Sequence, residues 1–407
     1  MDAFMFAKRL PAVLLATAAL LGCGSKGGAP RDASAGDADG PHTDAPHDVA
    51  PHDVAPDDVA VPTDTGADVA NGPAPVVLAR APGCGAARLA LADGTLFWTE
   101  RATGLVKKVS VTGGAPMVVA AGQAMPGAIA ADDVAVYWSD EGDRTLRRAT
   151  LDGADDGDGD GGVPAPLLTA AAPVSALVAA GGVLYYSAGT STFAVPRAGG
   201  VPSTLATFAT CRPNTPGAIA AGGAYVYETA DLLQFIVRAR TDGAQLGNNP
   251  CLAADAGAPQ INIPETVSHT QGALLLDALA VTGSEVVWAD HGFIAAKTTG
   301  VVAQATSRDV ALSAGSNVIT GFVVSGARVY LGESDDPGAG PTAHTIQVAP
   351  FGAAGDDAET PTATVVATGQ VGARSFVADA THVYWVTHTP SATSGAPADC
   401  AIASLKQ

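Results

Sequence analysis

A run in which Asp alternates with Gly is the first part of this sequence whose spacing could do chemistry. The stretch 155–162 places carboxylates at alternate positions: Asp156, Asp158 and Asp160. Oxygen ligands at alternate positions, with a glycine sixth, are the pattern of a calcium-binding loop. The twelfth position is Leu167, where such a loop needs a bidentate glutamate. The pattern therefore predicts a weak and exposed calcium site, with an acidic hairpin tip as the alternative.

Residues that act as nucleophiles or metal ligands in enzymes do not form a recognisable set. The sequence has no Gly-x-Ser-x-Gly elbow, no His-Glu-x-x-His helix and no phosphate-binding Gly loop. Among the scattered histidines, only His382 and His388 lie close together, on either side of one expected strand. The sequence therefore predicts no catalytic residue and no cofactor other than the weak calcium candidate.

Composition and charge exclude two classes of protein. The 407 residues carry a net charge of -19, so the clustered Lys and Arg of a nucleic-acid-binding surface are not expected. With 48 Gly and 28 Pro, the chain is also a poor candidate for a mostly helical fold, because both residues break helix interiors. An all-β domain fits this composition better.

The N-terminus has the order of a secretory signal. Lys8 and Arg9 are followed by an apolar run from Leu10 to Leu21, which is too short to span a bilayer. We therefore predict a signal peptide over residues 1–22.

The end of this signal resembles the lipobox of bacterial lipoproteins. The residues Leu20-Leu21-Gly22-Cys23 have its aliphatic, tolerant, small and cysteine positions. The resemblance implies cleavage before Cys23, whose thiol would carry a lipid that holds the protein at a membrane. Gly24 follows Cys23 in place of an Asp, which favours the outer membrane or cell surface, with the periplasmic side not excluded. A plain secreted protein with a stray cysteine is the alternative.

A spacer is expected to follow the lipidated cysteine. Residues 23–74 show no hydrophobic periodicity and repeat a short unit, seen in 46–50, 51–55 and 56–60. Proline at every fifth residue opposes helix, and the many like-charged Asp residues repel one another, so an extended, disordered tether is predicted. The tether histidines, which could bind a transition metal weakly or merely replace Asp in a drifting repeat, are His42, His47 and His52.

The remainder, residues 75–407, is a series of repeats. Each unit has a small apolar strand, a turn, an aromatic-rich strand, a third strand, a Gly turn and a fourth strand. The second strands carry one large marker residue each: Trp98, Trp138, Tyr186, Tyr227, Trp288, Leu331 and Trp385. Four strands in roughly 40–50 residues is the period of a β-propeller blade. The sequence predicts an all-β propeller of seven four-stranded blades, with six as the alternative, and the markers filling the space between neighbouring blades.

An uncharged stretch from Gly161 to Pro196 raises the alternative of a membrane span. Prolines and the pair Gly181-Gly182 interrupt it, and it aligns strand for strand with residues 113–146. We therefore expect it to form a buried blade rather than a transmembrane helix.

One blade carries the motif of a known repeat. Tyr137-Trp138-Ser139-Asp140, followed by Arg147, resembles the YWTD repeat of extracellular propellers. The whole layout resembles surface lipoproteins with a degenerate propeller, a largely uncharacterised family. The resemblance implies the fold and a place in the envelope, and it adds no activity.

Closure of the ring is expected to use both ends of the domain. The segment 75–79 resembles the fourth strands at 117–120 and 364–367, and it precedes the first inner strand. It is therefore predicted to supply the outer strand of the last blade, next to the final strand 401–407, so that no sheet edge stays open. Such a pairing places Cys84 close to Cys400, and a disulfide between them would fasten the closure.

The other cysteines follow by subtraction. With Cys23 lipidated, four cysteines remain, an even number in an oxidising compartment. A second pair would be Cys211 with Cys251. Four unpaired thiols are the alternative.

Two classes of function remain open. The first is a monomeric, non-catalytic binding or scaffold module, anchored by lipid, that meets a protein or glycan partner through loops on one propeller face. The insertions at 243–274 and 332–361 are the expected partner-facing loops. The alternatives are a metal-dependent or carbohydrate-active propeller enzyme, or an outer-membrane assembly lipoprotein.

Overall fold

The computed structural model divides the chain into two units, Met1–Thr63 and Asp64–Gln407, and the second carries all the residues described here. The described residues are 74–81, 88–152, 163–207, 218–230, 235–244, 265–269, 279–283, 285–290, 293–298, 308–312, 318–334, 344–352, 360–389 and 399–407. Within these ranges every regular element is a β-strand, and no helix is long and apolar enough to cross a membrane.

The described strands form seven antiparallel sheets of four strands each, which we call blades one to seven in chain order. Blade one consists of β2 (Leu89–Ala92), β3 (Thr95–Glu100), β4 (Leu105–Ser110) and β5 (Met117–Ala120). Blade two consists of β6 (Pro126–Ala131), β7 (Ala135–Asp140), β8 (Thr145–Thr150) and β9 (Pro166–Thr169). Blade three consists of β10 (Val174–Ala180), β11 (Val183–Ala188), β12 (Ser191–Pro196) and β13 (Ser203–Thr207). The uncharged stretch therefore forms strands of blades two and three, as predicted.

The second half of the domain repeats this plan. Blade four consists of β14 (Ile219–Gly222), β15 (Tyr225–Ala230), β16 (Phe235–Arg240) and β17 (Glu265–His269), and blade five of β18 (Leu279–Thr282), β19 (Glu285–Asp290), β20 (Phe293–Thr298) and β21 (Arg308–Leu312). Blade six consists of β22 (Val318–Ser325), β23 (Arg328–Ser334), β24 (Thr345–Pro350) and β25 (Thr364–Thr368). Blade seven consists of β26 (Arg374–Ala378), β27 (His382–Thr389), β28 (Asp399–Lys406) and β1 (Val76–Ala81).

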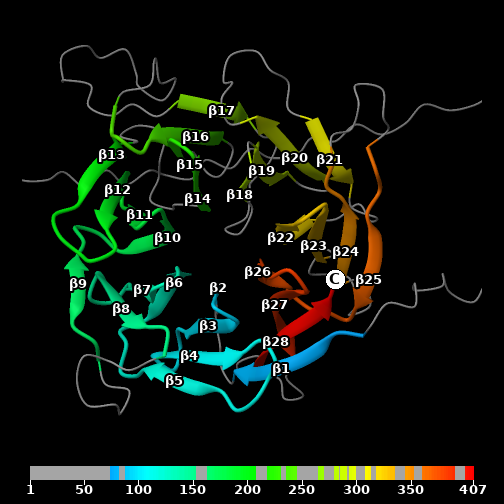
Figure 1. Cartoon of the computed structure of the whole chain (residues 1–407), viewed down its shortest axis with the longest axis horizontal. Coiled ribbons are helices and arrows are strands. Elements are labelled where there is room, and N and C mark those ends of the chain that lie inside the picture. The colour runs from blue at the N-terminus through cyan, green and yellow to red at the C-terminus, as the bar shows by residue number, and fades with distance from the viewer. Residues whose placement is uncertain are drawn as a thin grey trace, which may run out of the picture. The chain divides into compact units, whose positions relative to one another are not determined.

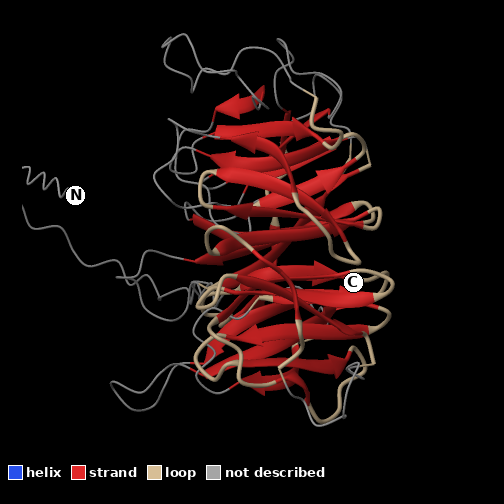
Figure 2. Cartoon of the chain, turned by 90° about the vertical axis from the view of Figure 1, so that its left-hand side faces the viewer, coloured by secondary structure: helices blue, strands red, loops and turns tan. Residues whose placement is uncertain are grey.

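The first strand of each blade lies innermost, and these seven strands form a closed ring (Figure 1). Each inner strand contacts the inner strand of the next blade, and β26 of blade seven contacts β2 of blade one. Seen edge-on in Figure 2, the strands cross the domain from one face to the other. The sheets are therefore arranged radially around an axis, as in a propeller.

The ring is closed by pairing of the two ends of the domain. β1 pairs antiparallel with β28, with Val76 opposite Ser404 and Ala81 opposite Cys400. This confirms the prediction that an N-terminal strand supplies the outer strand of the last blade. Cys400 is disulfide-bonded. Cys84, its predicted partner, lies outside the described residues, so that pairing stays a prediction.

The marker side chains form the core between blades. Trp98, Trp138 and Trp385 are fully buried, and Trp288 is 2% exposed. Trp138 of blade two packs with Phe97, Val106 and Val119 of blade one. A large apolar side chain buries much area, so one marker for each blade, aromatic in every blade but the sixth, fills the space between neighbouring sheets.

Glycines make the turns between third and fourth strands. Gly113 and Gly114 lie between β4 and β5 with φ of 88° and 126°. Gly199 and Gly200 repeat this between β12 and β13, with φ of 94° and 130°. Residues with a Cβ rarely adopt these angles, which explains the recurring Gly-Gly pair.

Candidate functional site: the axial cavity and the mouth face

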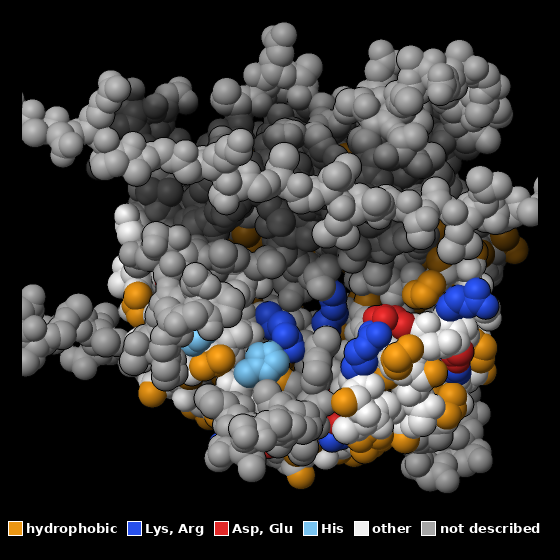
Figure 3. Space-filling model, turned by 180° about the vertical axis from the view of Figure 1, so that it is seen from behind, with side chains coloured by type: hydrophobic (Ala, Val, Ile, Leu, Met, Phe, Trp, Pro, Cys, Tyr) orange, Lys and Arg blue, Asp and Glu red, His pale blue; other side chains and the backbone are white. Residues whose placement is uncertain are grey.

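Chain direction divides the ends of the strands between two faces. The inner strands begin on one face, where the second strands end and the third strands start; we call it the mouth face. The opposite face carries the turns between first and second strands and between third and fourth strands; we call it the turn face. Figure 3 shows the mouth face, where Lys, Arg and His side chains lie near the middle of the described surface.

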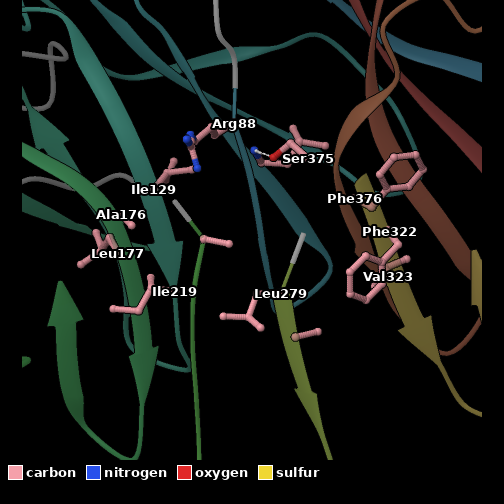
Figure 4. Close-up of a pocket in the computed structure, with 13 residues that line it drawn as sticks. Arg88, Ile129, Ala176, Leu177, Ile219, Leu279, Phe322, Val323, Ser375 and Phe376 are labelled. Atoms are coloured by element: carbon pink, nitrogen blue, oxygen red, sulfur yellow. Dashed lines mark hydrogen bonds between the residues drawn. The ribbon is translucent and has the colours of Figure 1, made fainter. Parts of the chain in front are cut away.

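A cavity of about 210 Å³ lies on the axis of the ring. Every inner strand contributes to its lining (Figure 4), and the lining residues are Arg88, Leu89, Ile129, Ala176, Leu177, Ala218, Ile219, Leu279, Ala280, Phe322, Val323, Ser375 and Phe376. Eleven of these thirteen side chains are hydrocarbon. Its two polar side chains come from blades one and seven.

The polar side of the cavity is at the seam between the last blade and the first. The backbone N–H of Leu89 donates a hydrogen bond of 2.8 Å to Oγ of Ser375. Ser375 has a φ of 53° and lies within a break in the register of β26 with β27, between Arg374 and Val377. A residue other than glycine held in the left-handed region is strained, and such strain persists only where the surroundings fix it.

Arg88 immediately precedes β2 and is positioned through its own backbone. Its carbonyl oxygen accepts a hydrogen bond of 3.4 Å from the N–H of Thr99, and the next residue, Leu89, is bound to Ser375. Figure 4 shows its side chain among those of the lining residues, on the same side of the cavity as Ile129 and Ser375. Arg88 is therefore a cationic residue among those that line the cavity, and its backbone is fixed on both sides.

Blade seven brings a second cation and a histidine to the same face. Burial, and then the charge of Arg374, lower the pKa of His388 below 6.5. The Nδ1 atom of His388 lies 3.7 Å from the sulfur of Cys400. Gly372 leaves room for the imidazole, because a Cβ on this residue would lie 2.6 Å from Cδ2 of His388. His388 is therefore a neutral, packed side chain at neutral pH.

Buried ion pairs stabilise the mouth face of blades one and two. Nζ of Lys107 lies 3.0 Å from Oε1 of Glu100, which also accepts a hydrogen bond of 3.0 Å from Nε1 of Trp98. In blade two, Nε of Arg147 lies 2.9 Å from Oδ2 of Asp140. The acid ends the second strand, and the base stands opposite the marker tryptophan on the third strand.

The YWTD-like residues of the sequence therefore have a structural role. Asp140 is 1% exposed, so the motif places a carboxylate inside the protein and supplies its counter-charge from the next strand. Burial raises the pKa of Asp140, and the hydrogen bond and charge of Arg147 act against that rise.

A different arrangement of hydrogen bonds, centred on an aspartate, recurs on the turn face. Asp132 accepts hydrogen bonds from the N–H groups of Val134 and Ala135, and the phenol of Tyr137 lies 3.2 Å from its Oδ2. Burial, followed by the charge of Asp132, raises the pKa of Tyr137 to about 12. Asp379 and Tyr384 repeat the arrangement in blade seven, at 2.6 Å. These carboxylates fix hairpin turns.

Most of the predicted site residues cannot be placed. Cys23, Cys84, Cys211 and Cys251, and the calcium candidates Asp156, Asp158 and Asp160, all lie outside the described residues. Among the residues that are described, no group of three or more His, Cys, Asp or Glu could hold a metal ion. His382 and His388 occupy opposite ends of β27 and therefore do not form a site.

The sequence reasoning missed the cavity and its cation. It interpreted the inner strands as packing, and this holds for most of their side chains. Arg88 stands one residue before a predicted inner strand, and Ser375 lies within another. A polar residue at the start of an apolar inner strand was the available signal, because all these strands begin on one face.

Comparison with known proteins supports the fold. The crystal structure of virginiamycin B lyase from Staphylococcus aureus is similar to 81% of this chain and 98% of its own, with a TM-score of 0.50 and 9% sequence identity. The chain folds as a β-propeller. A structure of a nidogen/laminin complex matches 54% of this chain and 79% of its own, with a TM-score of 0.40 and 13% identity. No family model and no curated protein matches the sequence.

Proposed function

We propose that this chain is a lipid-anchored binding module of the bacterial envelope, whose propeller meets a protein or glycan partner on the mouth face. The anchor is Cys23, the tether is residues 23–74, and the propeller is the rigid body that presents the face. The proposal for the anchor rests on the lipobox resemblance.

The observation that supports binding most strongly is the rigid construction of the mouth face. Ion pairs lie within the blades, as between Arg147 and Asp140, and also between them, as between Arg101 of blade one and Glu141 of blade two at 2.6 Å. A face whose side chains are already ordered loses little conformational entropy when a partner binds. Loops and side chains displayed on a rigid scaffold are the usual place for recognition.

The partner-binding face can be tested with a matched pair of substitutions. Met125 on the mouth face is 46% exposed, and Val134 on the turn face is 45% exposed. Each would be changed to Glu in a chain fused to a proximity-labelling enzyme and expressed in intact cells. We expect Met125→Glu to deplete specific labelled proteins or glycoconjugates, and Val134→Glu to leave them labelled. Equal labelling by both variants, or selective loss with Val134→Glu, would contradict the assignment of the face.

The anchor has a separate test. Globomycin inhibits signal peptidase II, so treated cells should accumulate the unprocessed precursor, and Cys23→Ser should prevent lipid attachment. The readouts are electrophoretic mobility and incorporation of a labelled fatty acid. Normal processing in the presence of globomycin would rule out the lipoprotein reading and leave the propeller assignment untouched.

A further inference from the structure

We propose that the outer rim of blades seven and one docks on a lipid bilayer with anionic headgroups, through four side chains that we call the rim patch: Val76, Val77, Met117 and Val118. This proposal deepens the proposed function and rests on its lipid anchor. It states how the anchored propeller lies against its membrane, which is on its rim, with the mouth face left uncovered.

The rim patch is exposed on the outermost strands of two neighbouring blades. Among the described strands, β1 and β5 each pair with a neighbour on one side only. The exposed fractions are 58% for Val76, 48% for Val77, 59% for Met117 and 46% for Val118. Consecutive residues of a strand point to opposite sides, so both sides of each strand are open to solvent at these positions.

The two halves of the rim patch lie next to each other at the seam of the ring. β1 and β5 are neighbours on the rim in Figure 1. A Cβ on Gly113, in the turn that leads into β5, would lie 3.9 Å from Cδ2 of Leu78 in β1. Ala115 and Pro116, which follow that turn, are also exposed and extend the apolar surface toward Met117.

Other blades carry polar residues at the same positions. The register of the sheets places Val77 and Val118 level with the marker tryptophans of their blades. The equivalent pairs in blades three, five and six are Ser203-Thr204, Arg308-Asp309 and Thr364-Val365. Packing of a blade therefore does not require apolar residues here, and a group of exposed apolar side chains indicates an interaction surface.

The point where the chain enters the domain favours a bilayer as the occupant. β1 directly follows the predicted tether and supplies half of the rim patch. A flexible tether of about fifty residues reaches roughly 40 Å, so a lipid on Cys23 would hold the bilayer near the patch at a high effective concentration. The tether itself is a poor occupant, because proline at every fifth residue of its repeat cannot donate to a strand edge.

The charge beside the rim patch fits anionic lipid headgroups. The outer two strands of the two blades, β28 with β1 and β4 with β5, contain four bases and one acid: Arg80, Lys107, Lys108, Lys406 and Asp399. Lys107 is paired with Glu100, whereas Arg80 and Lys406 are exposed. This excess of bases is opposite in sign to the net charge of the chain, -19. Apolar side chains combined with bases bind proteins to anionic membrane surfaces.

Vesicle flotation tests the proposal on the mature chain, residues 23–407, in which Cys23→Ser removes the lipid. The vesicles contain phosphatidylglycerol and phosphatidylcholine in equal amounts, or phosphatidylcholine alone. We expect the chain to bind the mixed vesicles, and Met117→Asp to lower its partition coefficient about tenfold. Lys406→Gln should lower binding to the mixed vesicles about fivefold and leave binding to phosphatidylcholine alone unchanged.

Matched variants show whether the effect belongs to the rim patch. Val201→Asp introduces the same charge at a residue that is 91% exposed, after the corresponding turn of blade three, and should keep full affinity. Arg328→Gln removes an exposed base at the start of β23 in blade six and should also bind normally. Thermal unfolding confirms that each variant is folded, and Val76→Asp replaces Met117→Asp if that variant does not fold.

Three results would overturn the proposal. The first is no flotation of the chain that carries Cys23→Ser alone, and the second is an equal loss of binding in Met117→Asp and Val201→Asp. The third is a dimer in lipid-free sedimentation velocity that becomes a monomer with Met117→Asp, because a second copy would then cover the patch. The flotation assay does not involve the lipid on Cys23 or the mouth face, so this proposal and the proposed function can fail separately.

Discussion

Replacing Arg147 by Met should strongly destabilise the propeller, because it leaves a carboxylate buried without its counter-charge. The side chain of Arg147 is 9% exposed, and that of Asp140 is 1% exposed. Arg147 also lies 2.6 Å from Oδ2 of Asp143 and donates to the carbonyl oxygen of Pro164. The methionine keeps most of the apolar stem of the arginine, so the substitution mainly removes charge and hydrogen bonds.

The magnitude follows from the distance and the burial. Two charges 2.9 Å apart attract by about 6 kcal/mol at an effective dielectric constant of about 20. Most of this is offset by the cost of desolvating both ions in the native chain, but the cost for Asp140 remains when Arg147 is lost. Breaking a buried pair in this way costs about 3–5 kcal/mol. Asp140→Asn in the Arg147→Met background should recover part of that loss, because the buried charge is then gone.

The free energy of unfolding that is lost in Arg147→Met should also depend on pH. Burial raises the pKa of Asp140, and removal of Arg147 removes the groups that oppose this rise. A carboxyl group whose pKa is higher in the folded chain stabilises it below the unfolded pKa of about 4 and loses that contribution as pH rises through the folded pKa. The deficit of Arg147→Met should therefore be smaller at pH 4 than at pH 7.

Urea unfolding followed by tryptophan fluorescence measures this effect, and the adjacent residue provides the control. Arg148 is exposed, and its guanidinium donates a hydrogen bond of 3.5 Å to the carbonyl oxygen of Arg197. Arg148→Met should change the free energy of unfolding by less than about 0.5 kcal/mol. Equal losses in the two variants, or a deficit that grows toward low pH, would refute the reasoning.

Three further expectations concern other parts of the ring. Gly332→Ala should cost about 1–3 kcal/mol in urea unfolding, because the new Cβ would lie 2.8 Å from a phenylalanine ring of blade seven; a neutral effect would mean that the ring moves freely. Burial raises the pKa of Asp379, but the hydrogen bond from Tyr384 and its backbone donors outweigh it and bring the pKa to about 2. The stability that this carboxylate contributes should be present above about pH 4 and lost toward pH 2. Asp379→Asn should therefore flatten the plot of the free energy of unfolding against pH in this range, and an unchanged plot would contradict this role of Asp379. Non-reducing peptide mapping should recover Cys84 linked to Cys400, and a different partner for Cys400 would displace the predicted closure disulfide.

Local patterns were enough to predict the plan of the propeller. A marker such as Trp138 is large and apolar, lies in the middle of a short strand, and recurs at the spacing of a blade. Its burial between blades therefore follows from its type and position. The closure of the ring was predictable for the same reason, since 75–79 resembles other outer strands and has no partner within blade one.

The polar interior was less accessible from sequence. Asp140 and Arg147 belong to a visible motif, but the sequence does not say that both are buried and paired. That depends on the register of β7 with β8, which places Arg147 directly opposite Trp138. A carboxylate at a strand end looks the same in sequence whether water or a neighbouring strand satisfies it.

The sequence by itself determined the strands, their grouping into blades and the way the ring closes, because each depends on residue type and local spacing. Only the tertiary structure decided where a site could be. Arg88 and Ser375 are 287 positions apart in the chain, and they line one cavity because closure of the ring places β26 beside β2. An inner strand has the same apolar pattern whether its side chains face the axis or the next blade. The cavity therefore became visible once all seven inner strands were in place.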